Sequence, residues 1–367
     1  MTMKFEIDRD ALVQPLQFVS GVVERRQTVP VLANLLMQVK AGELSLIATD
    51  QEVELRASTN NLLALEEGSA TIPARKLVDI CRSLPSNTVV TCELEGARLS
   101  IASGQFRSHL ATLPVTDFPH TEMDEVKVEQ ILQPADLQAL LDKTMFAMAQ
   151  QDVRYFFNGM LIEIDAESVS MVATNGQRLA INQLSGRFAV AAKQQFIVPR
   201  KGVVELMRMV KDEPLKLEFA ANHLRVTAGH LSLITKLIDA TYPDYQRAIP
   251  VGGDKVVNGA RSEIRDALTR TGIFANEMYR NVSLNLSPGN LKIKANNPQQ
   301  EEAEENVAVD YDGSSLEIGF NVGYLIDALS VIAGDRVQMT FTDGNSAVLL
   351  RSPDDSQSRF VISPMML

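Results

Sequence analysis

Apolar residues recur at helical spacing in six segments of the chain, which form three pairs. The second segment of each pair has apolar residues at positions i, i+3, i+4 and i+7, the pattern of a helix that buries one face. These residues are Leu77, Ile80, Cys81 and Leu84; Val203, Leu206, Met207 and Val210; and Val322, Leu325, Ile326 and Leu329. The first segments are marked by Leu12, Leu16 and Val19; Leu137, Leu140, Leu141 and Met148; and Ile264, Ala267 and Leu268. Six amphipathic helices are expected, although Pro15 is unfavourable inside the first of them.

Between the helical segments the hydrophobic period changes to two. Apolar residues alternate with polar neighbours at Leu44 and Leu46, at Val169 and Met171, and at Leu291 and Ile293. Such alternation is typical of strands with one face toward solvent. Strands that follow one another without a helical crossover pair antiparallel. The pattern therefore predicts an α+β fold, with helices packed on antiparallel sheets, rather than a doubly wound α/β fold.

The alternating pattern belongs to an internal repeat. Residues 34–50 align without gaps on residues 159–175, which lie 125 positions further on, and a third copy runs from 281 to 297. A unit of about 120 residues is a small domain rather than a solenoid module. Similar segments, 113–119 and 237–243, end the first two copies. We therefore expect three repeated domains, each with two helices, at residues 1–125, 126–253 and 254–367.

Composition and charge change this picture little. The 45% hydrophobic and 22% charged content is ordinary for globular domains. The first residues lack an apolar signal core and no apolar run reaches transmembrane length, so we expect a cytoplasmic protein without membrane contact. Cys81 and Cys92 are expected to be buried thiols. The net charge of −11 is unfavourable for a nucleic-acid-binding protein as a whole, but it does not describe any single face.

The sequence contains almost none of the known catalytic or metal-binding motifs. The four histidines have no metal-ligand partner at i+2 or i+4, and no phosphate loop, nucleophile elbow or dinucleotide fingerprint occurs. The glutamate run at residues 301–305 allows two interpretations, a divalent metal site or a charged strand or loop that faces solvent or a basic partner. We favour the second and predict no catalytic residue, metal site or cofactor.

Several short motifs together resemble the bacterial DNA polymerase III β sliding clamp family, in order along the whole chain. They are Pro73-Ala74-Arg75-Lys76, Gln151-Asp152-Val153-Arg154-Tyr155, Val198-Pro199-Arg200-Lys201-Gly202, Tyr242-Pro243-Asp244-Tyr245, Asn296-Asn297-Pro298 with the glutamate run, and Phe320-Asn321-Val322. The resemblance implies a non-catalytic subunit that pairs head to tail into a homodimeric ring around duplex DNA. The implied partners are double-stranded DNA of any sequence, the DNA polymerase III catalytic subunit, the clamp loader and other proteins with clamp-binding motifs.

The resemblance also implies three sets of functional residues. A hydrophobic peptide cleft between the second and third domains would be lined by Phe157, Thr174, Gly176, Arg178, Leu179, Pro243, Arg247, Ala248, Asn321, Tyr324, Val361, Ser363, Pro364 and Met365. DNA contacts would come from Arg26, Gln151, Tyr155 and Phe156. The dimer joint would contain Ile273 and Phe274, with Arg98 and Arg107 facing Glu301, Glu302, Glu304 or Glu305.

Some of these positions depart from the family pattern. Gln177 stands where His is common, Ser363 where Met is familiar, and Met366 where Arg is common. Phe157 is bulkier than the usual aliphatic residue. A cleft with a changed shape and a changed peptide preference is therefore expected.

Two other functions remain open. A peptide-binding scaffold or a clamp paralogue would not be loaded on DNA. A metal-dependent DNA-processing enzyme would use the glutamate run, and its activity would disappear in Glu304→Gln. We rank both below the sliding clamp.

Overall fold

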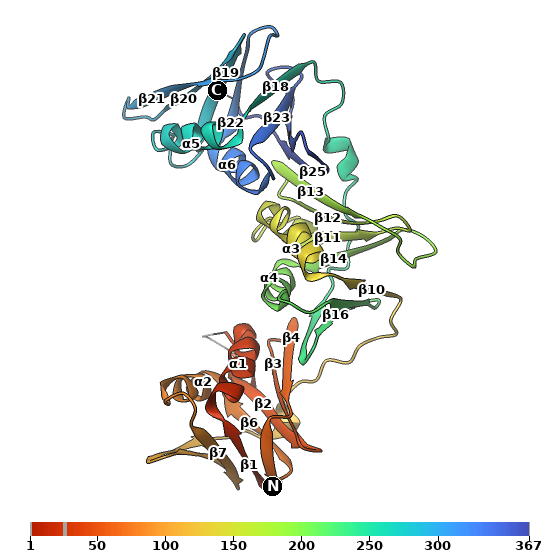
Figure 1. Ribbon diagram of the computed structural model, residues 1–367, viewed down its shortest axis with the longest axis vertical. Coiled ribbons are helices and arrows are strands. Elements are labelled where there is room, and N and C mark those ends of the chain that lie inside the picture. Colours follow the sequence, from red (N-terminus) through yellow and green to blue (C-terminus); the bar gives the residue numbers. More distant parts are fainter. Residues whose placement is uncertain (1, 25–27, 367) are drawn as a thin grey trace. The chain divides into compact units, whose positions relative to one another are not determined.

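The computed structural model describes residues 2–24 and 28–366 and divides the chain into two compact units. The first unit contains Met1–Pro134 and Lys201–Leu237, and the second contains Ala135–Arg200 and Ile238–Leu367. The second sequence repeat therefore contributes to both units. Of its strands labelled in Figure 1, β10 and β16 belong to the first unit and β11 to β14 to the second. Every strand pairing between named strands is antiparallel, which confirms the predicted α+β class.

The first unit is built from two sheets and three α-helices. The smaller sheet has the order β5-β1-β7-β8-β9, with β1 Thr2–Asp8, β5 Leu62–Glu66, β7 Val89–Glu95, β8 Arg98–Ser103 and β9 Phe106–Ala111. The larger sheet has the order β10-β15-β16-β17-β4-β3-β2-β6, with β2 Asn34–Lys40, β3 Glu43–Thr49, β4 Val53–Thr59, β6 Gly68–Pro73, β10 Val128–Leu132, β15 Leu215–Phe219, β16 His223–Ala228 and β17 Leu231–Lys236. The helices are α1 Arg9–Val19, α2 Ala74–Ser83 and α4 Arg200–Met209, with short 3₁₀ segments at Ser20–Val22, Pro30–Ala33 and Val115–Asp117.

The second unit is likewise built from two sheets and three α-helices. Its larger sheet has the order β14-β11-β12-β13-β25-β24-β23-β18, with β11 Gly159–Ile164, β12 Ser168–Thr174, β13 Arg178–Ser185, β14 Gln194–Pro199, β18 Lys255–Ala260, β23 Arg336–Phe341, β24 Val348–Ser352 and β25 Asp355–Ile362. Its smaller sheet has the order β21-β20-β19-β22, with β19 Asn281–Ser287, β20 Asn290–Asn296, β21 Glu302–Ala308 and β22 Leu316–Asn321. The helices are α3 Pro134–Asp142, α5 Arg261–Gly272 and α6 Val322–Val331, with 3₁₀ segments at Met145–Ala147, Tyr155–Asn158 and Tyr245–Ala248.

Each larger sheet joins strands of two consecutive repeats. Leu55 of β4 lies opposite Leu233 of β17, and Leu179 of β13 lies opposite Val361 of β25. This pairing provides hydrogen-bond partners for backbone N–H and C=O groups that would otherwise be unpaired at the edges of two separate sheets. Hydrophobic alternation shows which face of a strand is buried but not which strand lies beside it. The pairing of strands from different repeats could therefore not be predicted from the pattern.

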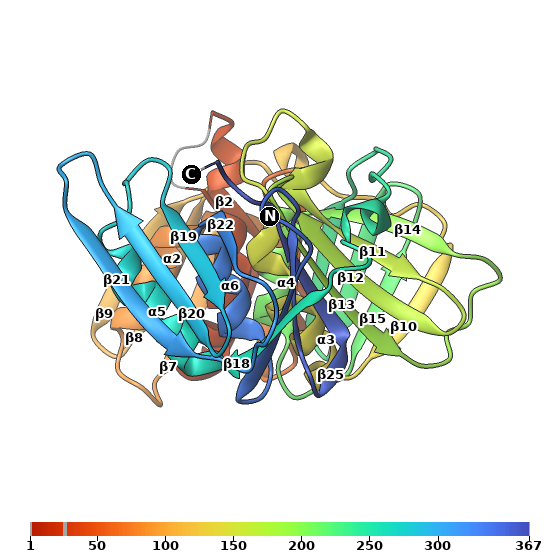
Figure 2. The ribbon, with the colours of Figure 1, turned by 90° about the horizontal axis from the view of Figure 1, so that it is seen from above.

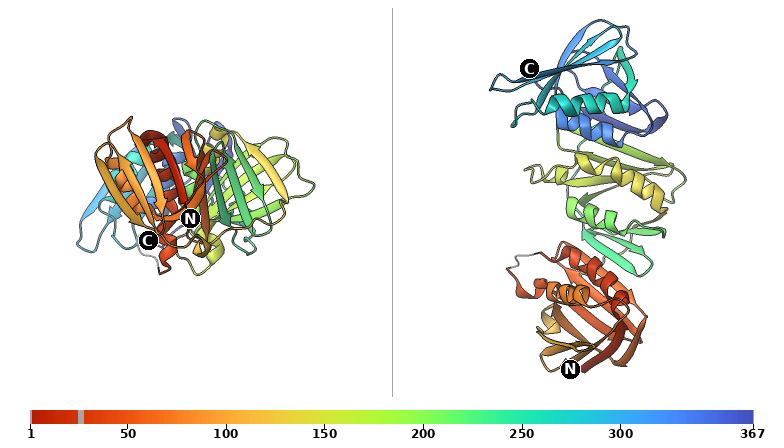
Figure 3. Two further views of the ribbon diagram at one scale, coloured as in Figure 1. Left: turned by 90° about the horizontal axis from the view of Figure 1, so that it is seen from below. Right: turned by 60° about the vertical axis from the view of Figure 1, so that its left-hand side comes forward.

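The helical stripes form the core beside the sheets. Leu77, Leu206 and Leu325 are fully buried, and the paired helices α5 and α6 lie side by side (Figure 3). Helix α1 continues through Pro15, although proline removes one helical hydrogen bond. Its fully buried Leu12 and Leu16 stabilise it, because burial of an apolar face supplies most of the stability of a protein helix.

Three details of the sequence prediction are wrong. Met148 lies outside α3, which ends at Asp142. A strand, β1, β10 or β18, precedes the first helix of each copy, and the hydrophobic pattern did not predict these three strands. The polar neighbours of Val169 and Met171 do not face solvent, since Ser168 and Ser170 are buried in the middle of the sheet.

The two cysteines are free and fully buried, as predicted. Burial raises the pKa of the Cys81 thiol to about 12, which keeps it protonated and unreactive at neutral pH. Among the helices of the described ranges, none has both the length and the apolar character to cross a membrane.

Candidate peptide-binding cleft

The turn between β12 and β13 is held by its own side chains. The Thr174 hydroxyl accepts a hydrogen bond from the Gly176 N–H (3.0 Å) and donates one to the Arg178 carbonyl (2.6 Å). The side-chain oxygen Oδ1 of Asn175 accepts from the backbone N–H groups of Gln177 and Arg178, both at 3.0 Å. Gly176 has a φ of +87°, a left-handed conformation that favours glycine. The turn therefore presents Arg178 in a defined direction.

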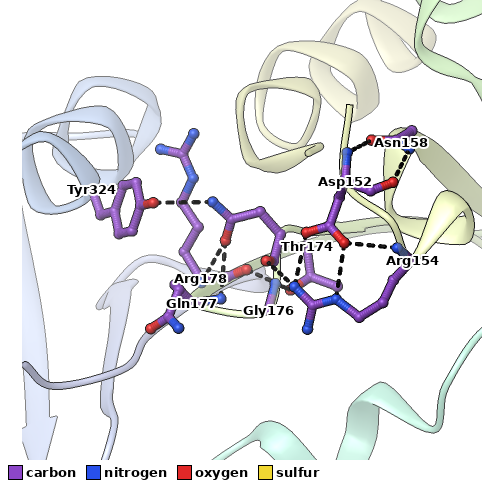
Figure 4. A network of polar contacts seen from close by, with 9 residues as sticks. Asp152, Arg154, Asn158, Thr174, Gly176, Gln177, Arg178 and Tyr324 are labelled. Carbon is purple, nitrogen blue, oxygen red and sulfur yellow. Dashed lines mark hydrogen bonds and ion pairs between the residues drawn. The ribbon is translucent and has the colours of Figure 1, made fainter. Parts of the chain in front are cut away.

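Arg178 connects this turn to helix α6 (Figure 4). Its guanidinium lies 4.5 Å from the centre of the Tyr324 ring and 5.2 Å from the centre of the Phe146 ring, and it forms an ion pair with Asp327 of α6. The planar guanidinium can stack and pair at the same time, which an ammonium cannot do. The Asn175 amide also donates to the Tyr324 hydroxyl (3.2 Å). The second and third repeats thus meet through polar and aromatic contacts at this point.

An apolar cluster lies behind the turn. It contains Ala149, Phe157, Leu161, Val172, Leu179, Ile181, Ile197, Tyr242, Tyr245 and Val361. The Phe157 ring packs edge-on against Phe156 (centroids 4.6 Å apart) and Tyr242 (6.0 Å). Because Phe157, Leu179 and Val361 are buried, they form the floor of the proposed cleft rather than its exposed walls.

The segment after Tyr242 forms one rim. Pro243, Arg247 and Ala248 are exposed, while the neighbouring Tyr242 and Tyr245 belong to the buried cluster. The Tyr245 hydroxyl donates to Glu163 (3.1 Å), and burial, together with this carboxylate, raises the pKa of Tyr245 to about 12. The tyrosine stays protonated and holds the rim to the sheet.

The C-terminal segment forms the opposite rim. The Ser363 N–H donates to the Gln177 carbonyl and the Met365 N–H to the Gly319 carbonyl, both at 2.8 Å. An open hollow of about 680 Å³ lies beside this segment, lined by Gln177, Asn276, Tyr279, Asn281, Asn296, Asn297, Pro298, Pro364, Met365 and Met366. Asn321 borders it by donating to the Tyr279 carbonyl (3.3 Å) while its oxygen caps α6. Of the predicted cleft residues, Pro364 and Met365 line this hollow, whereas Phe157, Leu179 and Val361 lie in the apolar cluster. The role of the predicted set in peptide binding stays a prediction.

Sequence reasoning missed two residues that hold the cleft in place. Arg154 lies over the Phe157 ring at 4.7 Å and donates to the Asn175 carbonyl (3.2 Å). Hydrogen bonds from the Arg154 side chain and backbone hold the pKa of Asp152 at about 2, so the carboxylate that orients Arg154 stays ionised. Asp327, the partner of Arg178, was also missed. The Arg154–Asn175 and Arg178–Asp327 contacts join segments that are separated in the chain, so residue spacing does not reveal them.

The residues predicted to contact DNA are only partly described. Arg26 lies outside the described residues. Gln151 is exposed with a φ of +56°, Tyr155 is 56% exposed, and Phe156 is half-buried between Tyr155 and Phe157. Gln151 and Tyr155 are therefore accessible, with Tyr155 at the start of the 3₁₀ segment that precedes β11, and a contact to DNA stays a prediction.

The residues predicted for the dimer joint lie mainly near sheet edges. Arg98 is on β8 and Arg107 on the edge strand β9, whereas Glu302, Glu304 and Glu305 are on the edge strand β21 (Figure 2). Ile273, after α5, is 76% exposed, and Phe274 is half-buried.

The glutamate run is paired within its own chain. Glu304 forms an ion pair with Lys292 (2.8 Å), and Glu305 accepts a 2.9 Å hydrogen bond from Arg270. Glu301 accepts from the Asn297 amide (2.7 Å). Within the described residues there is no group of three or more His, Cys, Asp or Glu side chains arranged to hold a metal ion. These contacts support the interpretation of the run as a charged strand.

Comparison with known proteins gives a consistent result along the whole chain. Models of the DNA polymerase III beta subunit match in order: the N-terminal domain at residues 3–122, the central domain at 131–244 and the C-terminal domain at 246–366. Relatives described as beta sliding clamps from Pseudomonas aeruginosa and Escherichia coli are 47% and 42% identical, over 100% of both chains in each case. The solved structure of the DNA polymerase III subunit beta from Pseudomonas aeruginosa has a TM-score of 0.97 at 46% identity and 100% coverage of both chains. A sliding clamp from Bartonella birtlesii bound to griselimycin has a TM-score of 0.97 at 32% identity, also with 100% coverage of both chains.

Proposed function

The chain belongs to the DNA polymerase III beta subunit family, the sliding clamps, and we propose that it encircles duplex DNA and tethers polymerases through the cleft described above. The observation that carries this function is the match of three clamp domains in order over the full chain. We assign the domains to residues 1–125, 126–253 and 254–367. The clamp has no catalytic activity of its own and works in the cytoplasm.

A ring of two subunits follows from the repeat. Two copies of three similar domains give six, which approximates sixfold geometry, and a head-to-tail joint can close into a ring. The exposed Ile273 and the edge strands β9 and β21 support a joint in which one subunit's β9 approaches its partner's β21. Arg98 and Arg107 would then lie near the glutamate run. Since each exposed ion pair contributes at most about 1 kcal/mol, apolar packing decides the stability of this joint.

The cleft takes a short, partly apolar peptide from the polymerase catalytic subunit, the clamp loader or another protein with a clamp-binding motif. The contacts of Arg178 with Tyr324 and Asp327 support this assignment, because they fix the two repeats on either side. Met365 offers an adaptable apolar contact on the rim. Gln177, Ser363 and Met366 give this chain a peptide preference of its own.

Contacts with DNA are weak and independent of sequence. Arg26, Gln151, Tyr155 and Phe156 supply a charge, polar groups and an aromatic surface for phosphate and sugar contacts, which carry no sequence information. Arg26→Ala should reduce loading or residence on DNA without unfolding the protein. A topological link needs no strong binding, so a free subunit should bind linear duplex weakly, and more weakly at high salt.

Retention on circular DNA tests this function directly. With a clamp loader and ATP, the labelled protein should co-migrate with nicked circular DNA and be released when the circle is cut. Retention on cut DNA, or strong preference for one sequence, would contradict encirclement.

A protein that binds clamp-motif peptides but is never loaded would be a scaffold instead. Magnesium-dependent cleavage of DNA that disappears in Glu304→Gln would identify a DNA-processing enzyme.

A further inference from the structure

The turn at residues 49–53 in the first unit repeats, bond for bond, the turn at residues 174–178 beside the proposed cleft. The Thr49 hydroxyl accepts from the Gln51 N–H (3.0 Å), and Asp50 accepts from the next two N–H groups (2.9 and 2.8 Å). Gln51 has a φ of +77°, close to the +87° of its counterpart, Gly176. The scaffold that presents the cleft in the second unit is therefore built a second time, where the first and second repeats share a sheet.

The strands beside the two turns also correspond. The Lys236 N–H donates to the Glu52 carbonyl (3.0 Å), as the Ser363 N–H donates to the Gln177 carbonyl (2.8 Å). Lys236 therefore occupies the place of Ser363 on the rim. Its cross-strand neighbour in the sheet is His223. Lys236 and His223 thus place two nitrogen-bearing side chains on the strands beside this turn.

One position of the apolar floor has been replaced, while the neighbouring cluster of Val31, Leu32, Leu36, Ile47 and Phe118 stays apolar. Glu54 stands at the repeat position of Leu179 and is only 3% exposed. Its carboxylate accepts from the Thr121 N–H (3.2 Å) and lies 3.5 Å from the Arg56 guanidinium. A buried, paired carboxylate cannot hold the apolar anchor of a clamp-binding peptide, because its desolvation would not be compensated. The second copy of the scaffold therefore differs from the cleft at the position of Glu54, where it presents a polar group.

A cavity of about 330 Å³ remains at this place. It is lined by Thr49, Gln51, Pro119, His120, Thr121, Glu122, His223 and Lys236. Lys236 and the two imidazoles can donate hydrogen bonds into it, and Glu122 carries the one carboxylate of the lining. Of the neighbouring carboxylates, that of Glu54 is paired with Thr121 and Arg56, and that of Asp124 accepts from Asn222. The lining therefore favours a ligand that accepts hydrogen bonds and carries negative charge.

The Nδ1 atom of the His223 imidazole is buried and makes no hydrogen bond among the described residues. The nearest carboxylate, that of Asp124, is 3.8 Å away, beyond hydrogen-bond range, and accepts instead from the Asn222 amide (3.1 Å). Buried polar atoms are normally satisfied, so an unpaired one beside a cavity indicates a missing partner.

We infer that this cavity is a second recognition site, which takes an acidic side chain of a short peptide segment. Lys236 and the two histidines donate to the carboxylate, and Pro119 forms a stiff rim, as Pro243 does in the cleft. The cavity accommodates one compact acidic side chain and its peptide unit. This inference rests on the residues of the first unit and does not require the cleft to bind its own peptide.

Fluorescence anisotropy with the full chain tests this site. A labelled peptide of alternating Asp and Glu should bind, whereas a peptide of the same length made of Asn and Gln should not. Lys236→Ala and His223→Gln should each weaken binding about tenfold, the scale of one charged hydrogen bond. Lys40→Ala removes the same charge at an exposed position of the same unit and should leave the affinity unchanged. Thermal melting of each variant checks that the fold is intact.

Three outcomes would overturn the inference: equal binding of the Asn-Gln peptide, equal weakening by Lys40→Ala, or Lys236-dependent binding of inorganic phosphate without binding of the peptide. A deletion of residues 364–367 separates this site from the cleft. The deletion should weaken clamp-motif binding roughly thirtyfold and leave the affinity for the acidic peptide unchanged. If the cleft assignment alone is wrong, the deletion will change the affinity for neither the clamp-motif peptide nor the acidic peptide.

Discussion

The side-chain amide of Asn175 donates a 3.2 Å hydrogen bond to the hydroxyl of Tyr324 and so joins a turn of the second repeat to helix α6 of the third. The Arg178 guanidinium lies over the same tyrosine ring, 4.5 Å from its centre. One aromatic side chain therefore receives a polar contact at its hydroxyl and a cation at its face. The two contacts hold the walls of the proposed cleft together, and substitutions can separate them.

Tyr324→Phe should weaken the binding of a clamp-motif peptide by about two- to tenfold. It removes the hydroxyl and its hydrogen bond, worth roughly 0.5–1.5 kcal/mol, and keeps the ring under Arg178. Tyr324→Ala removes both contacts and should cost more than tenfold, since a cation–π contact adds about 0.5–2 kcal/mol. Isothermal titration calorimetry on both variants measures the difference. Equal losses would mean that the ring contact contributes nothing.

Acid should destabilise the second unit through Asp355. Its carboxylate accepts from Lys143 (2.8 Å) at the end of α3 and from Ser358 (2.6 Å). Burial alone would raise the pKa of Asp355, but these bonds and the Gln357 N–H outweigh it and hold the pKa at about 2. The folded pKa lies below the unfolded value of about 3.9. The ionised form therefore stabilises the fold fully above about pH 4, and this contribution is lost as the pH falls toward 2.

Asp355→Asn should remove that pH-dependent contribution, which amounts to about 2 kcal/mol. The midpoint of urea unfolding should be lower than that of the wild type at pH 7, and the difference should shrink between pH 4 and pH 2.5. Asp354→Asn, at the exposed neighbouring position, provides the control. A constant difference across this range would show that Asp355 acts through packing rather than through its charge.

Apolar packing at the dimer joint should be sensitive to Ile273. This side chain is 76% exposed in the single chain, so Ile273→Asp should leave the fold of the subunit unchanged. If Ile273 is buried in the joint, the variant should be monomeric at micromolar concentration, because a buried unpaired carboxylate is costly. Light scattering across a dilution series measures this, with Val251→Asp, 90% exposed in the same unit, as the control. Phe274→Ala should shift the equilibrium in the same direction. A dimeric Ile273→Asp protein would place the joint elsewhere.

The sequence predicted the scaffold of this protein better than its site. Apolar stripes such as Val203 and Leu206 predicted the helices correctly. A helix that buries one face needs apolar residues at helical spacing, so this spacing is visible in the sequence. Spacing could not predict that β4 pairs with β17, since a strand's neighbour depends on the rest of the chain. Arg154 was missed because its contacts with Phe157 and Asn175 become visible only in three dimensions.

Deleting residues 364–367 should weaken clamp-motif binding by about 2 kcal/mol or more, which is roughly thirtyfold in affinity. The deletion removes Pro364, which stiffens the rim, and the half-buried Met365, whose N–H is bonded to the Gly319 carbonyl. Met366→Ala is the matched control, because the Met366 side chain is 97% exposed and its loss should change the affinity little. Retention of an already closed ring on circular DNA should not change, since it depends on the dimer joint. Calorimetry at matched dimer content compares wild type, deletion and control, and equal affinities for all three would remove the cleft assignment while leaving the ring.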